Sequence, residues 1–178
     1  KDVLKESTKP TLYNPNYVNT TIDLKQLTAG IKKTKNARLC LYGIPGTGKS
    51  AFGQYVAKVL KKPLLLKKGS DLISKWVGGT EQNIARAFSE AKEQKAILVF
   101  DEVDSFLADR TQAKQSWEVT QVNEMLVQME NFDGVFIATT NLMDNLDKAS
   151  IRRFDIKLEF KSLEKIKLMG CLKSLLKI

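Results

Sequence analysis

Short runs of apolar residues alternate along this 178-residue chain with longer stretches in which apolar residues recur every three or four positions. The runs at residues 38–42, 62–67, 96–100, 135–139 and 156–160 predict five β-strands. The stretches between them have the spacing of helices with one buried face. Strands that alternate with helices predict an α/β fold, in which helices cover both faces of a five-stranded parallel sheet.

Four helices are expected within this pattern: at residues 21–35, directly after Lys49, from Thr80 as the capping residue, and around residues 119–129. The last three each have one apolar face. These faces are formed by Phe52, Tyr55, Val56, Val59 and Leu60, by Ile84, Phe88 and Ala91, and by Val119, Val122, Leu126 and Met129.

Three regions are expected along the chain. Residues 1–20 are polar and contain Pro10 and Pro15, which predicts an N-terminal arm or linker. Residues 21–161 are expected to form the α/β domain. Residues 162–178 have an apolar stripe at helical spacing, which predicts the start of a truncated helical lid. Because residue 1 is Lys and not Met, we interpret the chain as a fragment of a longer protein.

Composition limits the chemistry that is open to the chain. The longest apolar run is too short to cross a bilayer, and no signal-peptide pattern is present. Two cysteines and no histidine exclude the usual zinc spacings and histidine catalysis, and they fit a cytoplasmic protein. The net charge of +9 could indicate a nucleic-acid or an acidic-protein partner. The lysines are scattered with few aromatic residues between them, so a solvated surface is favoured.

The most informative segment fits the pattern G-x-x-x-x-G-K-[ST] of a phosphate-binding P-loop, because a strand precedes it and a helix follows it. Its glycines allow backbone N–H groups to turn toward a phosphate chain. Lys49 is expected to contact the β- and γ-phosphates, and the Ser50 hydroxyl to coordinate Mg²⁺. The nucleotide-binding residues are predicted to be Gly43, Ile44, Pro45, Gly46, Thr47, Gly48, Lys49, Ser50 and Ala51.

A second segment places two carboxylates at the end of a buried strand. Residues 97–100 are all apolar, and Asp101 and Glu102 follow directly. Open parallel sheets bind ligands at this edge. Asp101 is expected to hold Mg²⁺, and Glu102 to polarise the attacking water as a general base. The pair therefore predicts hydrolysis of a nucleotide as well as binding.

Three further segments add to this pattern. In chain order they are Trp76-Val77-Gly78, Thr139-Thr140-Asn141 and Arg152-Arg153-Phe154-Asp155. With the P-loop and the acidic strand end, they resemble the classical AAA ATPases of the AAA+ superfamily, over about residues 30–165. Among these, the chain looks most similar to members that remodel or unfold proteins. The resemblance implies a P-loop NTPase sandwich of three layers, α/β/α.

The resemblance also implies roles for the three segments. Asn141 would orient the attacking water. Arg152 or Arg153, or both, would reach the nucleotide site of a neighbouring subunit, although many members separate these arginines and here they are adjacent. Trp76, Val77 and Gly78 would form a pore loop that grips a protein substrate. Arg110 matches an arginine that is often found near the subunit boundary, and its role stays open.

The expected activity is therefore Mg²⁺-dependent hydrolysis of ATP in a ring, a homohexamer by resemblance, that threads protein substrates through its pore. Two alternatives stay open. The chain could belong to a nucleic-acid-dependent motor, because residues 101–104 are similar to the acidic box of helicases. It could also be a scaffold whose assembly ATP controls.

Overall fold

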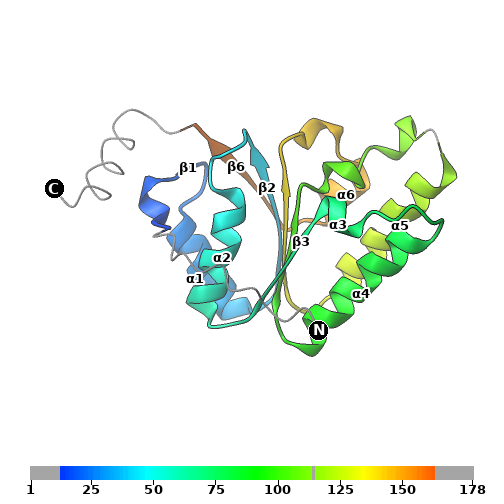
Figure 1. The fold of residues 1–178 in the computed structure, drawn as a ribbon. Helices are drawn as coiled ribbons and strands as arrows, with labels where there is room; N and C mark the ends of the chain where they lie inside the picture. The colour runs from blue at the N-terminus through cyan, green and yellow to red at the C-terminus, as the bar shows by residue number, and fades with distance from the viewer. Residues whose placement is uncertain (1–12, 114, 163–178) are drawn as a thin grey trace.

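The computed structural model describes residues 13–113 and 115–162, and they form three layers with a sheet in the middle (Figure 1). The sheet order is β1-β6-β2-β5-β4-β3. Neighbouring strands from β6 to β3 are parallel, and only β1 is antiparallel to its neighbour. The strands are β1 (Asn19–Thr20), β2 (Ala37–Gly43), β3 (Leu64–Lys68), β4 (Ile97–Asp101), β5 (Val135–Thr140) and β6 (Ile156–Lys161).

The sheet confirms the predicted α/β fold and corrects the predicted number of strands from five to six. The additional strand, β1, pairs Asn19 with Lys161 and Thr20 with Phe160. A strand of two residues is too short to produce a recognisable alternation of apolar and polar residues. The expected N-terminal arm therefore contributes to the sheet edge.

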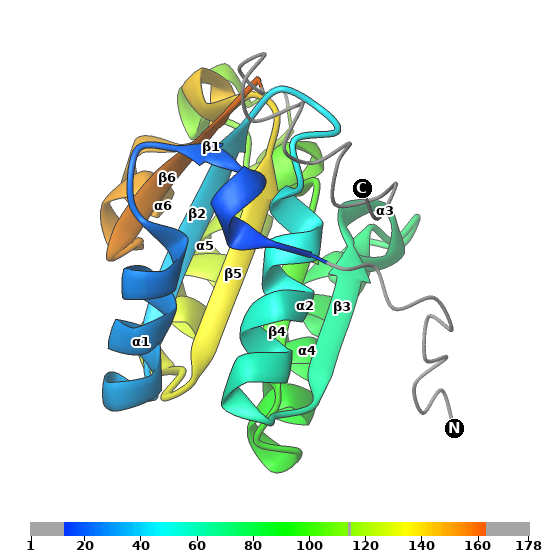
Figure 2. The same ribbon diagram turned by 90° about the vertical axis from the view of Figure 1, so that its left-hand side faces the viewer.

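Helices cover both faces of the sheet (Figures 1 and 2). One face carries α1 (Leu24–Thr34) and α2 (Lys49–Leu60). The other carries α4 (Gly79–Glu93), α5 (Ser116–Asn131) and α6 (Lys148–Arg153), and α3 (Gly69–Leu72) lies in the connection before α4. Four short 3-10 turns complete the described elements: η1 (Pro15–Tyr17), η2 (Val103–Ser105), η3 (Arg110–Gln112) and η4 (Met143–Asn145).

The central strands are apolar throughout because both of their faces are covered. In β4, Ile97 and Val99 contact the α1–α2 side, whereas Leu98 and Phe100 contact the α4–α5 side. All six residues of β5 are buried. No helix in residues 13–113 and 115–162 is long and apolar enough to cross a membrane.

Two local predictions change in the structure. The helix α1 begins after Asp23, whose carboxylate accepts hydrogen bonds from the N–H groups of Lys25 and Gln26. The helix α4 begins after Gly78, so Thr80 does not cap it. Instead, the buried Thr80 hydroxyl accepts a hydrogen bond from the N–H of Ser74 and fixes the preceding loop.

Part of the expected arm packs on the domain. The ring of Tyr13 lies 5.5 Å from that of Tyr55 and 6.4 Å from that of Phe52, between ring centroids. The helical lid expected at residues 162–178 lies outside the described residues, except for residue 162.

Candidate functional site

The P-loop joins the end of β2 to the start of α2, as the sequence predicts. Gly46 and Gly48 have φ angles of +77° and +95°, a region that favours glycine. Gly43 has no room for a side chain, since a Cβ there would lie 2.1 Å from the carbonyl oxygen of Phe160. No side chain caps the N-terminus of α2, so its first N–H groups face the loop without a side-chain partner.

Lys49 is 7% exposed and lies at the centre of the site. Its ammonium group donates to the carbonyl oxygens of Gly43 at 2.7 Å and Ile44 at 2.9 Å, and to the Asn141 side chain at 2.8 Å. Burial lowers the pKa of Lys49, and the charges of Asp101 and Asp104 oppose this shift. The structure thus brings together Lys49 and Asn141, which are 92 residues apart in the sequence.

Ser50 and Asp101 also meet. The Ser50 hydroxyl lies 2.9 Å from each oxygen of the Asp101 carboxylate. Hydroxyl and carboxylate oxygens are hard ligands that suit Mg²⁺, an ion that usually takes one or two protein ligands beside phosphates and water. The described residues contain no group of three or more His, Cys, Asp or Glu side chains that could hold a metal by themselves. The two residues therefore fit a magnesium ion that is held jointly with a nucleotide.

Glu102 follows Asp101 in a left-handed conformation, with a φ angle of 60°. Its side chain is exposed at the edge of the sheet, and its N–H donates to the Thr139 hydroxyl at 3.2 Å. A carboxylate in this place is accessible to water.

Sequence reasoning did not identify a set of hydrogen bonds that joins the ends of β4 and β5. The Thr139 hydroxyl donates to Asp101, and the Thr140 hydroxyl donates to Asp104. Asp104 also accepts the N–H of Asn141 at 3.3 Å. The signal in the sequence was the pair of consecutive threonines at the end of a buried strand. The ends of parallel strands meet at the carboxyl edge of the sheet, where these hydroxyls can reach carboxylates that follow another strand.

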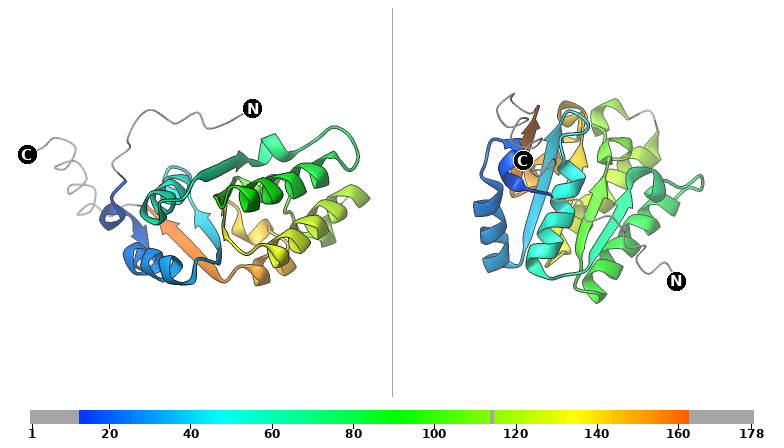
Figure 3. Two further views of the ribbon diagram at one scale, coloured as in Figure 1. Left: turned by 90° about the horizontal axis from the view of Figure 1, so that it is seen from below. Right: turned by 60° about the vertical axis from the view of Figure 1, so that its left-hand side comes forward.

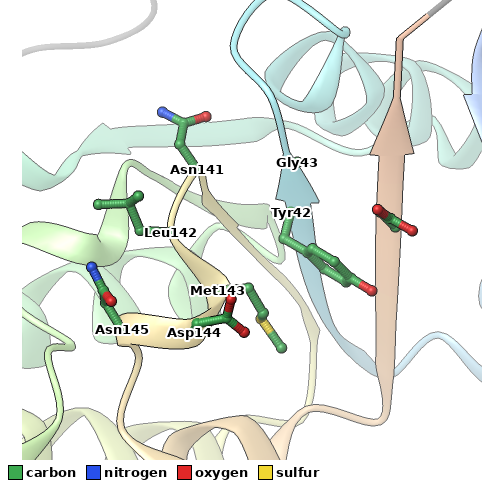
Figure 4. A pocket seen from close by; sticks show the side chains of 8 residues that line it. Tyr42, Gly43, Asn141, Leu142, Met143, Asp144 and Asn145 are labelled. Atoms are coloured by element: carbon green, nitrogen blue, oxygen red, sulfur yellow. The ribbon is translucent and has the colours of Figure 1, made fainter.

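An open pocket of about 410 Å³ borders this site (Figure 4). It lies between the ends of β2 and β6 and the loop that follows β5. Five of its eight lining residues have polar side chains. The lining consists of Tyr42, Gly43, Asn141, Leu142, Met143, Asp144, Asn145 and Glu159.

The two predicted trans-acting arginines lie at the opposite end of the strands from the P-loop of their own chain. They end α6 just before Ile156, which pairs with Leu39, whereas the P-loop begins at Gly43, which pairs with Phe160. Arg153 forms an ion pair with Glu130 at 2.6 Å and donates to the Ala149 carbonyl. Arg152 is exposed and makes no ion pair with a described residue.

Arg110 lies within the domain as a bridge between three elements. Its guanidinium donates to the Asp147 carboxylate at 2.9 Å and to the Asn123 side chain at 2.8 Å. Asp147 caps α6 through the N–H groups of Ala149 and Ser150. Burial alone would raise the pKa of Asp147, but the Arg110 hydrogen bond and the backbone donors lower it below its usual value.

The loop before α4 extends from the body of the domain (Figure 3). Trp76 is 83% exposed and Val77 is 86% exposed, so neither belongs to the core. Gly78, with a φ angle of +79°, ends the loop. Two hydrogen bonds hold the tip: the Gly79 N–H donates to the Trp76 carbonyl, and the Trp76 N–H donates to the Ser74 hydroxyl.

Comparison with known proteins agrees with this geometry. Residues 39–162 match the family model described as "ATPase family associated with various cellular activities (AAA)". The chain is 35% identical over 158 residues to the peroxisomal ATPase PEX1 of Saccharomyces cerevisiae, which covers 85% of this chain and 14% of that protein. It is 34% identical over 140 residues to vacuolar protein sorting-associated protein 4 of Dictyostelium discoideum. This match covers 75% of this chain and 31% of that protein.

A third relative is the SUPPRESSOR OF K(+) TRANSPORT GROWTH DEFECT 1 protein of Arabidopsis thaliana, with 38% identity over 122 residues, 65% of this chain and 28% of that protein. The chain thus spans less than a third of the length of each of these relatives.

Proposed function

This chain belongs to the AAA ATPase family, and from that premise we propose that its P-loop site binds ATP with Mg²⁺ and hydrolyses it to ADP and phosphate. The observation that carries the proposal is the joining of two pairs, Lys49 with Asn141 and Ser50 with Asp101, at the carboxyl edge of the sheet. The four residues come from the start of one helix, α2, and from the ends of two strands, β4 and β5, so only a folded domain brings them together.

The P-loop supplies binding of the triphosphate. The uncapped N-terminus of α2 offers N–H groups and a partial positive charge to phosphate oxygens. The Lys49 ammonium, now bonded to two loop carbonyls and Asn141, would exchange some of these partners for phosphate oxygens. Ser50 and Asp101 would hold Mg²⁺, which supplies neutralisation of phosphate charge when bound.

Two residues act on the attacking water in this proposal. Glu102 would accept its proton as general base, because its carboxylate is exposed directly after Asp101. Asn141 would orient the water through its side-chain amide. Asp104 and Thr140 support this role, because they fix the backbone of Asn141 beside Lys49.

An arginine from a second subunit would complete the site. Arg152 is the better candidate, since it is exposed, whereas Arg153 is held by Glu130. Its charge would stabilise the transferring phosphoryl group, an effect worth about 10³–10⁵ in rate in other nucleotide hydrolases. Hydrolysis would then require association of subunits, which we propose to be a homohexameric ring.

The exposed loop supports a role in protein remodelling. Trp76 and Val77 present a large apolar surface with few constraints, and Gly78 gives the loop backbone freedom. Such loops around the centre of a ring would grip an extended polypeptide. Two of the relatives are, by their names, a peroxisomal ATPase and a protein associated with vacuolar protein sorting. The cytoplasmic location expected from composition stays a prediction.

The proposed hydrolysis is tested by two variants measured for nucleotide binding and for turnover. Lys49→Ala should weaken ATP binding by at least about tenfold, because the buried ammonium is lost. Glu102→Gln should bind ATP with Mg²⁺ normally and lower turnover by about 10²-fold or more, because no base remains. Lys25→Ala and Glu93→Gln, both at exposed sites away from the P-loop, serve as matched controls. Unchanged ATP binding in Lys49→Ala would refute the proposed site.

The proposed substrate contact is tested at Trp76. Trp76→Ala should abolish stimulation of ATP turnover by a permanently unfolded polypeptide and leave basal turnover within about twofold, because the ring contributes to gripping and not to the nucleotide site. Trp76→Phe keeps an aromatic ring and should retain most of the stimulation. Equal stimulation of the alanine variant and the unchanged protein would exclude Trp76 from substrate binding.

A further inference from the structure

Three basic segments that are far apart in the sequence meet at one edge of the sheet. Residues 32–35, 58–62 and 92–95 end α1, α2 and α4, and each precedes a strand, β2, β3 or β4. In a parallel α/β fold these helix ends and strand starts share the amino edge, opposite the nucleotide site (Figure 2). The three segments contain eight lysines and a single acidic residue, Glu93.

We name this surface the lysine edge. Seven of its lysines are exposed and Lys62 is half-buried. None of the eight forms an ion pair with an acidic side chain in the part of the chain that the structure describes. Its members are Lys32, Lys33, Lys35, Lys58, Lys61, Lys62, Lys92 and Lys95.

The strand register aligns these lysines. Ala37 pairs with Val135 and Leu64 pairs with Ile97, so β2, β5, β4 and β3 begin at one level. Lysines precede three of these four starts, and Asp133 precedes the fourth. With about 4.8 Å between neighbouring strands, the row from β2 to β3 is about 14 Å wide.

The backbone indicates that these charges are not merely a consequence of helix termini. Lysines in the last turn of a helix are common, because they complement the helix dipole. The residue that leaves the helix in a left-handed conformation is, however, usually glycine or asparagine. Here Lys35, Lys61 and Lys95 take that conformation, with φ angles of 58°, 53° and 51°. Three helices therefore end on a charged residue where glycine would be less strained.

We propose that the lysine edge binds nucleic acid through its phosphates, without regard to base sequence. A row of lysines without arginine or exposed aromatic side chains neutralises phosphates and offers few of the groups that discriminate between bases. None of the exposed large apolar side chains of the described residues belongs to the three segments, so the edge offers no apolar anchor for a lipid surface. The site is separate from the P-loop, and nucleic acid would dock the domain without entering the hydrolysis reaction.

The proposal is tested with the 178-residue chain and a fluorescently labelled DNA duplex of mixed sequence, about 30 base pairs long, so that several phosphates lie within reach. The variant Lys35→Gly, Lys61→Gly and Lys95→Gly removes three charges and relieves three strained positions. It should bind the duplex at least about tenfold more weakly near 0.1 M salt. Its slope of log affinity against log salt should fall by about 2.7, or about 0.9 for each lost contact. Its thermal stability should not decrease, since glycine accepts the left-handed conformation.

The matched control loses the same charge elsewhere. Lys25→Gln, Lys68→Gln and Lys148→Gln lie outside the three segments and are exposed. This control should keep most of the affinity and slope for the duplex, and both triple variants should keep their ATP binding.

Three outcomes would overturn the proposal. These are an equal loss of affinity in the two triple variants, an unchanged affinity in the glycine variant, and binding of phosphatidylserine vesicles but not of the duplex. The last would assign the edge to a membrane surface. Failure of any of these tests leaves the Lys49 and Glu102 experiments unaffected, because those variants lie at the opposite edge.

Discussion

At the scale of single residues, the site depends on side chains that hold one another in place. Lys49 uses all three of its ammonium donors, and Asp101 receives hydrogen bonds from both Ser50 and Thr139. Few of these groups can change without affecting a neighbour. The residues proposed to act on nucleotide are therefore positioned before it binds, which lowers the cost of reaching the reactive geometry.

Asp104 provides a test of this positioning. Asp104→Ala removes the acceptor of the Thr140 hydroxyl and of the Asn141 N–H, so the loop that carries Asn141 should become less well placed. We expect turnover to fall by about tenfold or more, with the affinity for ATP changed by less than about threefold. Steady-state kinetics together with direct nucleotide binding would measure both. A variant that loses binding as strongly as turnover would show that Asp104 supports the P-loop itself.

At the scale of elements, one ion pair fixes how β6 joins β2. The Arg38 guanidinium and N–H both contact the Asp155 carboxylate, at 2.9 Å and 2.8 Å, and the Asp155 N–H donates back to the Arg38 carbonyl. These contacts link the start of β2 to the segment between α6 and β6. They hold in register the two strands that place Gly43 against Phe160.

The charge state of this link predicts how stability depends on pH. Burial alone would raise the pKa of Asp155, but the hydrogen bonds and charge of Arg38 lower it below its usual value, and Asp147 behaves similarly beside Arg110. Since the pKa values are lower in the folded state, both carboxylates stabilise the fold above the unfolded value of about 3.9. That stabilisation is lost as the pH falls through the lower folded values.

We therefore expect the urea midpoint of unfolding to be nearly constant from about pH 7 to about pH 5 and to decrease below about pH 4. Asp155→Asn should be less stable at neutral pH and should lose less stability on acidification. A midpoint that rose toward low pH, or an equal acid response of the variant, would contradict this account.

At the scale of the whole molecule, the two halves of the proposed reaction lie at opposite edges of one sheet. The P-loop and both carboxylates occupy the carboxyl edge, whereas Arg152 lies in the last turn of α6, near the amino edge. In the proposed reaction, the domain would therefore supply an arginine to another copy and not to its own nucleotide. This separation is the structural reason to expect activity only in an assembly.

Mixing of variants tests this expectation. Arg152→Ala and Glu102→Gln should each be nearly inactive alone, whereas mixtures should recover part of the turnover. Recovery is expected because an Arg152→Ala subunit keeps its own base and can receive the arginine of a Glu102→Gln neighbour. Arg153→Ala in place of Arg152→Ala serves as the comparison. The absence of any recovery with Arg152→Ala, at concentrations that allow assembly, would remove this residue from the role.

Local patterns in the sequence were enough to predict the five longer strands and α2. Burial on two faces leaves a continuous apolar run, and burial on one face leaves a periodic one. The P-loop and the acidic end of β4 were predicted from their residue types and spacing. The two-residue strand β1 and the start of α4 at Gly78 were not, since neither has a periodic signal of its own.

The contacts between residues that are distant in the sequence became known from the folded domain. The Lys49–Asn141 contact, the Thr140–Asp104 contact and the Arg153–Glu130 ion pair all join separate elements. The lysine edge also gathers residues from separate elements, although these lysines are scattered in the sequence. Strand order and register set these encounters, and both depend on how the whole core packs, which no single segment encodes.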